Sequence, residues 1–254
     1  MAEALENLIQ PLYTMPLEGV AFWVLVENTL IFIVTLVIGH IAVKVFKTHA
    51  ITEPPPPISR IEIVLAISCV LLNSLITWVG AVLWRAGIIQ LRPAGSFLNV
   101  LVDFVVLFFA MDFAMYVFHR AAHLPILYPL IHDTHHRFEN PRPLTLFVLN
   151  PFETLGFGAL WLVVIAIYPA SFIGMILYLT LNVAFGLMGH LGVEPFPRRW
   201  LELPVIRYIS TSTFHAEHHQ DRHHNYGFYT VIWDRLFGTL SPDYVDEFET
   251  AASG

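Results

Sequence analysis

The chain of 254 residues is 56% apolar and only 13% charged, whereas an ordinary soluble domain is about 45–50% apolar and about 25% charged. This composition excludes an ordinary soluble protein and predicts an all-α, multi-pass membrane protein. The net charge of −7, without any basic block, argues against a nucleic-acid partner, and the single cysteine, Cys69, excludes an intramolecular disulfide.

Three apolar runs are long enough to cross a membrane, at residues 21–39, 63–84 and 97–118. A hydrocarbon core of about 30 Å needs about 20 helical residues. The first run follows an acidic N-terminus with no basic region and no cleavage site of small residues, so we expect it to be retained rather than removed as a signal peptide. Four consecutive prolines at 54–57 form a stiff spacer between the first two spans.

A fourth apolar region, residues 155–188, contains no charged residue. As one helix it would be about 51 Å long, which is too long for a bilayer. Tyr168-Pro169 should break it into two short halves. We therefore expect a helical hairpin that penetrates the membrane only in part.

The basic residues indicate the orientation of the spans. Lys44, Lys47 and Arg60 bracket the first loop, whereas acidic residues and no Lys or Arg precede the first span. Because cytosolic loops carry the excess of Lys and Arg, the N-terminus should lie outside. Three crossings then bring the chain to the cytosolic side at His119. The hairpin at 155–188 returns it to the same side at His190.

Eight of the thirteen histidines fall into three tight clusters at these positions. The clusters, which we call the histidine boxes, are His119/His123, His132/His135/His136 and His215/His218/His219. On a helix, imidazoles at i and i+4 lie on one face and can reach one ion. The adjacent histidine of an HxxHH box points about a quarter-turn away, toward a second ion.

Eight imidazoles suit Zn, Cu, Fe or Ni, and ligand type alone does not choose among them. A structural zinc site usually includes Cys thiolates, which this chain cannot supply. The surplus of nitrogen ligands predicts a two-metal centre, with iron favoured if the chemistry involves oxygen.

Several polar residues stand near the boxes. Asp112 lies almost on the helical face of His119, with Tyr116 between them, and we expect both to support the ligands, Asp112 by accepting a histidine N–H. Asp103 fits a helix-packing role better. Asp133, Glu217 and Asp221 could hydrogen-bond to ligand rings or be solvated, and neither is favoured. His40 and His49 lie outside the pattern and are expected not to bind metal.

The three boxes, in this order after several spans, resemble the fatty acid hydroxylase superfamily, which includes sterol desaturases and sterol methyl oxidases. The approach to the first box at 112–120 and the tail Asn225-Tyr226-Gly227 with the segment 233–239 are also similar to that family. The resemblance covers about half of the chain, residues 112–239. It divides the sequence into membrane spans and linker at 1–95 and a catalytic domain at 96–254.

The resemblance implies a membrane enzyme with two iron ions (Fe²⁺) that uses O₂ to hydroxylate or desaturate an unactivated C–H bond of a lipid, either sterol-like or fatty acyl. Electrons would come from a separate donor, such as a cytochrome b5-like protein, a ferredoxin or a reductase. In several branches of the family a histidine pair lies between the second and third boxes. Here only His190 fits, and it is predicted as a ninth ligand.

Two further positions are open from the sequence. Glu194 could bind the metal or accept an imidazole N–H if the helix continued that far, although Gly192 and Pro195 oppose this. Either His223 or His224 could be a ligand or a surface residue, and we include His224 among the candidates.

Two other classes of protein remain as alternatives. A metal transporter needs polar groups near the bilayer midplane, and these histidines follow the spans. A metal-dependent membrane hydrolase would need neither O₂ nor reductant.

Overall fold

The computed structural model describes residues 10–92 and 96–254. In this part of the chain the regular elements are helices, and β-pairing is confined to isolated bridges. The long helices are α2 (Leu17–Val45), α3 (Arg60–Arg85), α4 (Phe97–Ala122), α7 (Pro151–Ile167) and α8 (Phe172–Gly189). The short helices are α5 (Tyr128–Ile131), α6 (Asp133–His136), α9 (Ser212–Gln220), α10 (Ile232–Phe237) and α11 (Tyr244–Ala251), with 3-10 turns at Pro143–Phe147, Arg198–Glu202 and Ile206–Tyr208. The all-α fold is confirmed.

Four of the long helices, α2, α3, α4 and α8, are long and apolar enough to cross a membrane, and α7 is a shorter apolar helix. Their outer faces carry large exposed hydrophobic side chains, which is the pattern of helices that face lipid. The three predicted spans fall inside α2, α3 and α4. The chain is therefore a multi-pass membrane protein.

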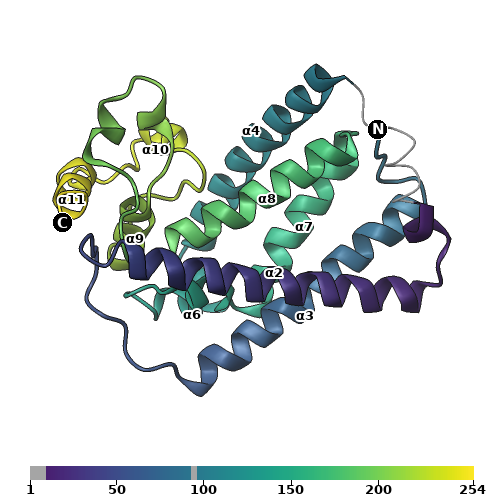
Figure 1. Ribbon diagram of the computed structural model, residues 1–254, viewed down its shortest axis with the longest axis horizontal. Helices are drawn as coiled ribbons and strands as arrows, with labels where there is room; N and C mark the ends of the chain where they lie inside the picture. The colour runs from purple at the N-terminus through teal and green to yellow at the C-terminus, as the bar shows by residue number, and fades with distance from the viewer. Residues whose placement is uncertain (1–9, 93–95) are drawn as a thin grey trace.

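The long helices form one bundle, in which α2 packs on α3, α3 on α7, and α4 on both α7 and α8. Figure 1 shows the short helices α9, α10 and α11 gathered at one end of this bundle. Polar side chains cap the starts of three helices: Ser59 precedes α3, Asn150 precedes α7 and Thr211 precedes α9. The caps fix where these helices begin.

The predicted hairpin at 155–188 exists and breaks where expected, since α7 ends at Ile167 and α8 begins at Phe172. How far it enters the membrane stays a prediction: α8 is long and apolar enough to cross, and α7 is shorter. Its turn reaches the first turns of α4, where Tyr168 Oη and the Ser171 amide donate to the Asp103 carboxylate, both at 2.8 Å. Asp103 lies sixteen residues before His119, about 24 Å along the helix, so the hairpin extends through most of the bundle.

Candidate metal centre

Nine histidines converge at the end of the bundle that α9 covers. His119 lies in the last turn of α4 and His123 caps that helix, while His190 caps α8. The second box lies on and just before the short helix α6, and the third box lies on α9. Residues separated by almost a hundred positions in the sequence thus meet because four helix ends lie together.

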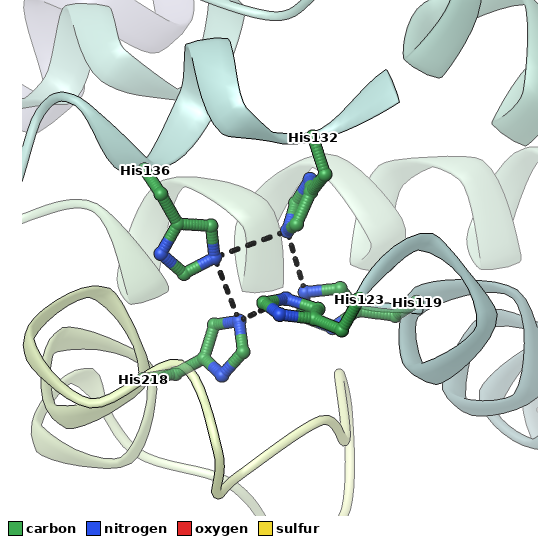
Figure 2. A group of neighbouring side chains, drawn as sticks. All are labelled: His119, His123, His132, His136 and His218. Carbon is green, nitrogen blue, oxygen red and sulfur yellow. Dashed lines mark hydrogen bonds between the residues drawn. The ribbon is translucent and has the colours of Figure 1, made fainter. Parts of the chain in front are cut away.

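The first group, group A, contains five rings whose ligand atoms all lie within 4.8 Å of one another: His119, His123, His132, His136 and His218. Figure 2 shows their Nε2 atoms turned toward a common centre. The Nε2 atoms of His119 and His132 are 2.9 Å apart, and Nε2 of His136 lies 3.0 Å from that of His218.

The second group, group B, contains four buried rings: His135, His190, His215 and His219. The Nε2 of His190 lies 3.2 Å from Nε2 of both His135 and His215. Nε2 of His219 lies 3.2 Å from that of His215. The predicted ninth histidine, His190, therefore lies at the centre of a group.

Backbone carbonyls fix the tautomer of four rings. The Nδ1–H groups donate to carbonyl oxygens in the pairs His119–Tyr226 (2.9 Å), His135–Val148 (3.2 Å), His190–Gly186 (2.7 Å) and His218–His224 (2.6 Å). Because a carbonyl can only accept, each Nδ1 carries the proton and each Nε2 presents a lone pair.

The donor set fits two cations. In His135 and His190 both Nδ1 atoms are protonated, so the two Nε2 atoms facing each other at 3.2 Å are both acceptors and cannot hydrogen-bond. Lone pairs at this separation repel unless a cation lies between them. In group A, His132 and His119 show the same arrangement: each Nδ1 donates to an oxygen, and the two Nε2 atoms face each other at 2.9 Å.

The rings are neutral before any ion binds. Burial and the neighbouring imidazoles lower the pKa of His132, His135, His215, His218 and His219 well below the usual range. Burial lowers the pKa of His190 to about 4, and burial with the nearby His119 lowers the pKa of His136 to about 3. Neutral imidazole is the form that binds metal.

Contrary to the prediction, Asp112 and Tyr116 do not hydrogen-bond to the ligand rings. The Asp112 carboxylate accepts from the Tyr229 amide (2.9 Å), from Thr230 Oγ1 (2.5 Å) and from Trp233 Nε1 (2.9 Å). The Tyr116 hydroxyl instead pairs with Thr239 Oγ1 at 3.0 Å. Because a buried carboxylate takes every donor within reach, the backbone and side-chain donors of the 229–233 loop satisfy Asp112 in place of a histidine.

The polar residues in and beside the boxes also bind elsewhere. Asp133 pairs with Arg137 at 2.7 Å, Glu217 accepts from Asn225 and Ser241, and Asp221 pairs with His224. His40 and His49 lie outside both groups, as expected.

His224 and Glu194 also lie outside both groups. The His224 ring pairs with Asp221 at 2.8 Å on the protein surface, and only its carbonyl reaches a ligand, His218. The chain leaves the helix after Gly189, so Glu194 lies off the α8 axis and accepts from the Thr213 amide and hydroxyl at 2.9 and 2.7 Å. Glu194 therefore holds the start of α9 rather than an imidazole.

Glu153 is a site residue that the sequence reasoning missed. Its Oε1 lies 2.7 Å from Nδ1 of His132, and its side chain is 1% exposed. The signal was present: Glu153 is a carboxylate at the start of an apolar helix, two residues before the uncharged stretch 155–188. The carbonyl partners of the other rings carry no such signal, since every residue has a carbonyl.

Fold and site together define a helical membrane protein in which nine histidines form two adjoining groups. The fatty acid hydroxylase family matches residues 104–239, just over half of the chain. The chain belongs to the fatty acid hydroxylase family, which confirms the resemblance drawn from the boxes.

Known relatives include proteins of two kinds. The chain is 27% identical to very-long-chain aldehyde decarbonylase GL1-7 of Oryza sativa subsp. japonica, over 82% of this chain and 34% of that protein. It is 35% identical to GL1-1 of Oryza sativa subsp. indica over 49% of this chain and 21% of that protein. Lathosterol oxidase of Mus musculus is 29% identical over 57% of this chain and 47% of the relative.

The chain thus spans about a third of the length of the first of these relatives and less than half of the other two. No solved structure matches it.

Proposed function

We propose that the protein is an O₂-dependent, two-iron membrane oxygenase that hydroxylates or desaturates an unactivated C–H bond of a lipid. The observation that carries this proposal is the convergence of nine neutral imidazoles in two adjoining groups at the end of an apolar bundle. Two iron ions bound there would supply the activation of O₂ and the oxidising equivalents for C–H cleavage.

The side chains present support iron over a structural zinc. The ligand atoms are nitrogens, while Cys69 is buried in α3 and belongs to neither group. Carbonyl partners hold four of the rings with Nε2 toward the centre, and eight of the nine rings are buried, which keeps bulk water out.

A small cavity of about 10 Å³ borders group B, lined in part by His190, His215, Phe185 and Phe228. This is about the space that one water-sized molecule occupies. Since α8 brings the cavity to the apolar bundle, we propose that O₂ and the lipid approach group B from this side. The separate electron donor would dock from water.

Labelled oxygen tests the reaction. In hydroxylation one oxygen atom of O₂ enters the lipid and the other leaves as water, with two electrons supplied by the donor. The iron-loaded protein in lipid nanodiscs, given reductant and ¹⁸O₂, should therefore yield a labelled alcohol. An unlabelled alkene would indicate desaturation, whereas activity that needs neither O₂ nor reductant would favour the hydrolase.

A long-chain aldehyde is the second candidate substrate. The alignment with the aldehyde decarbonylase GL1-7 covers 82% of this chain, whereas that with lathosterol oxidase covers 57%. Assays with a very-long-chain aldehyde, a sterol and a fatty acyl lipid, run in parallel on the same iron-loaded preparation, separate the two. Consumption of the aldehyde alone would replace C–H hydroxylation as the proposed reaction.

A further inference from the structure

One ligand ring, that of His132, is held differently from the four rings whose Nδ1 donates to a backbone carbonyl. The Nδ1 of His132 is hydrogen-bonded to the Glu153 carboxylate, whereas the Nδ1 of His119, His135 and His218 donates to a backbone carbonyl. Within residues 10–92 and 96–254, Glu153 is the one carboxylate that bonds to a ring of either group.

The position of Glu153 is costly for a carboxylate. It lies in the first turn of α7, beside the apolar α3, and is 1% exposed. Its second oxygen, Oε2, is buried without a hydrogen-bond partner. An ionised carboxylate out of water is strongly unfavourable unless positive charge compensates for it. Among the residues that the structure describes, the group hydrogen-bonded to the Glu153 side chain is the ring of a predicted ligand.

His132 connects the Glu153 carboxylate to group A. Its Nε2 lies 2.9 Å from Nε2 of His119 and 3.2 Å from Nε2 of His136, so the ring joins Glu153 to the centre of the group. A carboxylate that accepts the Nδ1 proton makes Nε2 a more basic ligand than a carbonyl does. Group B has rings held by carbonyls at His135 and His190 and no such carboxylate.

We propose that Glu153 is a positioning residue that orients His132 and, by its negative charge, makes group A hold its cation more tightly than group B. This inference rests on the proposed two-metal centre. It adds that the two sites are unequal and names the residue that makes them so.

Chelator competition on the purified, metal-loaded full chain tests the inference, with retained metal counted by mass spectrometry. The wild-type protein should lose its two ions in two steps. His215→Ala, in group B, should remove the earlier step, and His123→Ala, in group A, the later one. In Glu153→Gln, which keeps the size and one acceptor oxygen but removes the charge, the later step should move to about 10–100-fold less chelator.

Glu194→Gln is the matched control, because Glu194 is another buried carboxylate that bonds to the start of α9 and not to a ring. Since α9 carries rings of both groups, this variant should move both steps together. The same joint shift in Glu153→Gln, or no shift at all, would overturn the proposal.

The earlier step, which belongs to group B, guards against a general folding defect. In Glu153→Gln it should stay at the wild-type chelator concentration if Glu153 acts through His132 of group A. A general loss of folding would move both steps. A wild-type chain that holds fewer than two ions would instead overturn the two-metal centre itself, which distinguishes the two failures.

Discussion

Adjacent histidines in the boxes always separate between the two groups. In the second box His132 and His136 belong to group A and His135 to group B; in the third box His215 and His219 belong to group B and His218 to group A. Members at i and i+4 share a group because they share a helical face. Each HxxHH box therefore serves both groups, and the two boxes do so in opposite senses.

Because of this division, a single ligand change should remove one ion and leave the other, although either change should abolish activity. We expect His119→Ala to lose the ion of group A and His135→Ala the ion of group B, so each purified variant should retain about one ion per chain. Both should abolish turnover, and the double variant should be no less active than either, because the ligands act as a unit. Full activity in either single variant would refute a two-metal reaction.

Gly227 is required by close packing next to the site. A Cβ there would lie 2.4 Å from the Thr230 carbonyl oxygen and 2.6 Å from Asp234 Oδ2. Asp234 in turn accepts from the amides of Tyr226 and Gly227, and the Tyr226 carbonyl holds His119. A side chain at 227 would thus push on the loop that orients a ligand.

Gly227→Ala should destabilise the fold by about 1–3 kcal/mol and lower metal content, as measured by thermal unfolding and metal analysis. Gly19→Ala is the control, since its Cβ would meet only the flexible Met15 side chain at 3.5 Å or more. That variant should melt at the wild-type temperature or slightly above it. Equal melting of the two variants would contradict the packing argument.

At the level of elements, periodicity and apolar length predicted the helices well, because a span must satisfy its backbone internally. The three spans, the break at Tyr168-Pro169 and the convergence of the boxes with His190 follow from local patterns. What local patterns could not predict depends on contacts between distant segments. Asp112 has its donors on a loop more than a hundred residues away, and Asp103 on α4 accepts from the turn of the α7–α8 hairpin.

Asp103 anchors the turn of the α7–α8 hairpin. Asp103→Ala would leave the Ser171 amide, Tyr168 Oη and the Arg92 guanidinium without their acceptor, at a cost of about 1–3 kcal/mol for the buried amide alone. We expect a clear loss of thermal stability with metal content unchanged, since His119 lies about 24 Å away along α4. Asp103→Asn retains an acceptor oxygen and should be milder. Loss of metal from a folded Asp103→Ala protein would show that the hairpin positions the site.

On the scale of the whole molecule, Lys44 and Lys47 lie at the end that carries the histidines, whereas Arg85 and Arg92 lie at the other end. The loop after α2 lies against the chain that follows His190, where the Ile51 amide donates to the Gly192 carbonyl at 3.1 Å and the Glu194 amide to that of His49 at 2.8 Å. Lys44 and Lys47 are therefore near the metal groups. Arg92 lies at the other end, beside the hairpin turn, where its amide donates to the Ala170 carbonyl at 2.9 Å.

This distribution predicts that the histidine end faces the cytosol, because Lys and Arg are enriched in cytosolic loops. A Cys69→Ser background offers a clean test, since Cys69 is the single cysteine of the chain and is buried. Glu139→Cys places a thiol at an exposed position three residues after His136, and Gln90→Cys places one at an exposed position near Arg92. In intact cells a membrane-impermeant maleimide should label Gln90→Cys at once and Glu139→Cys only after permeabilisation. The reverse pattern would invert the topology and place the metal groups outside, where a cytosolic electron donor could not reach them.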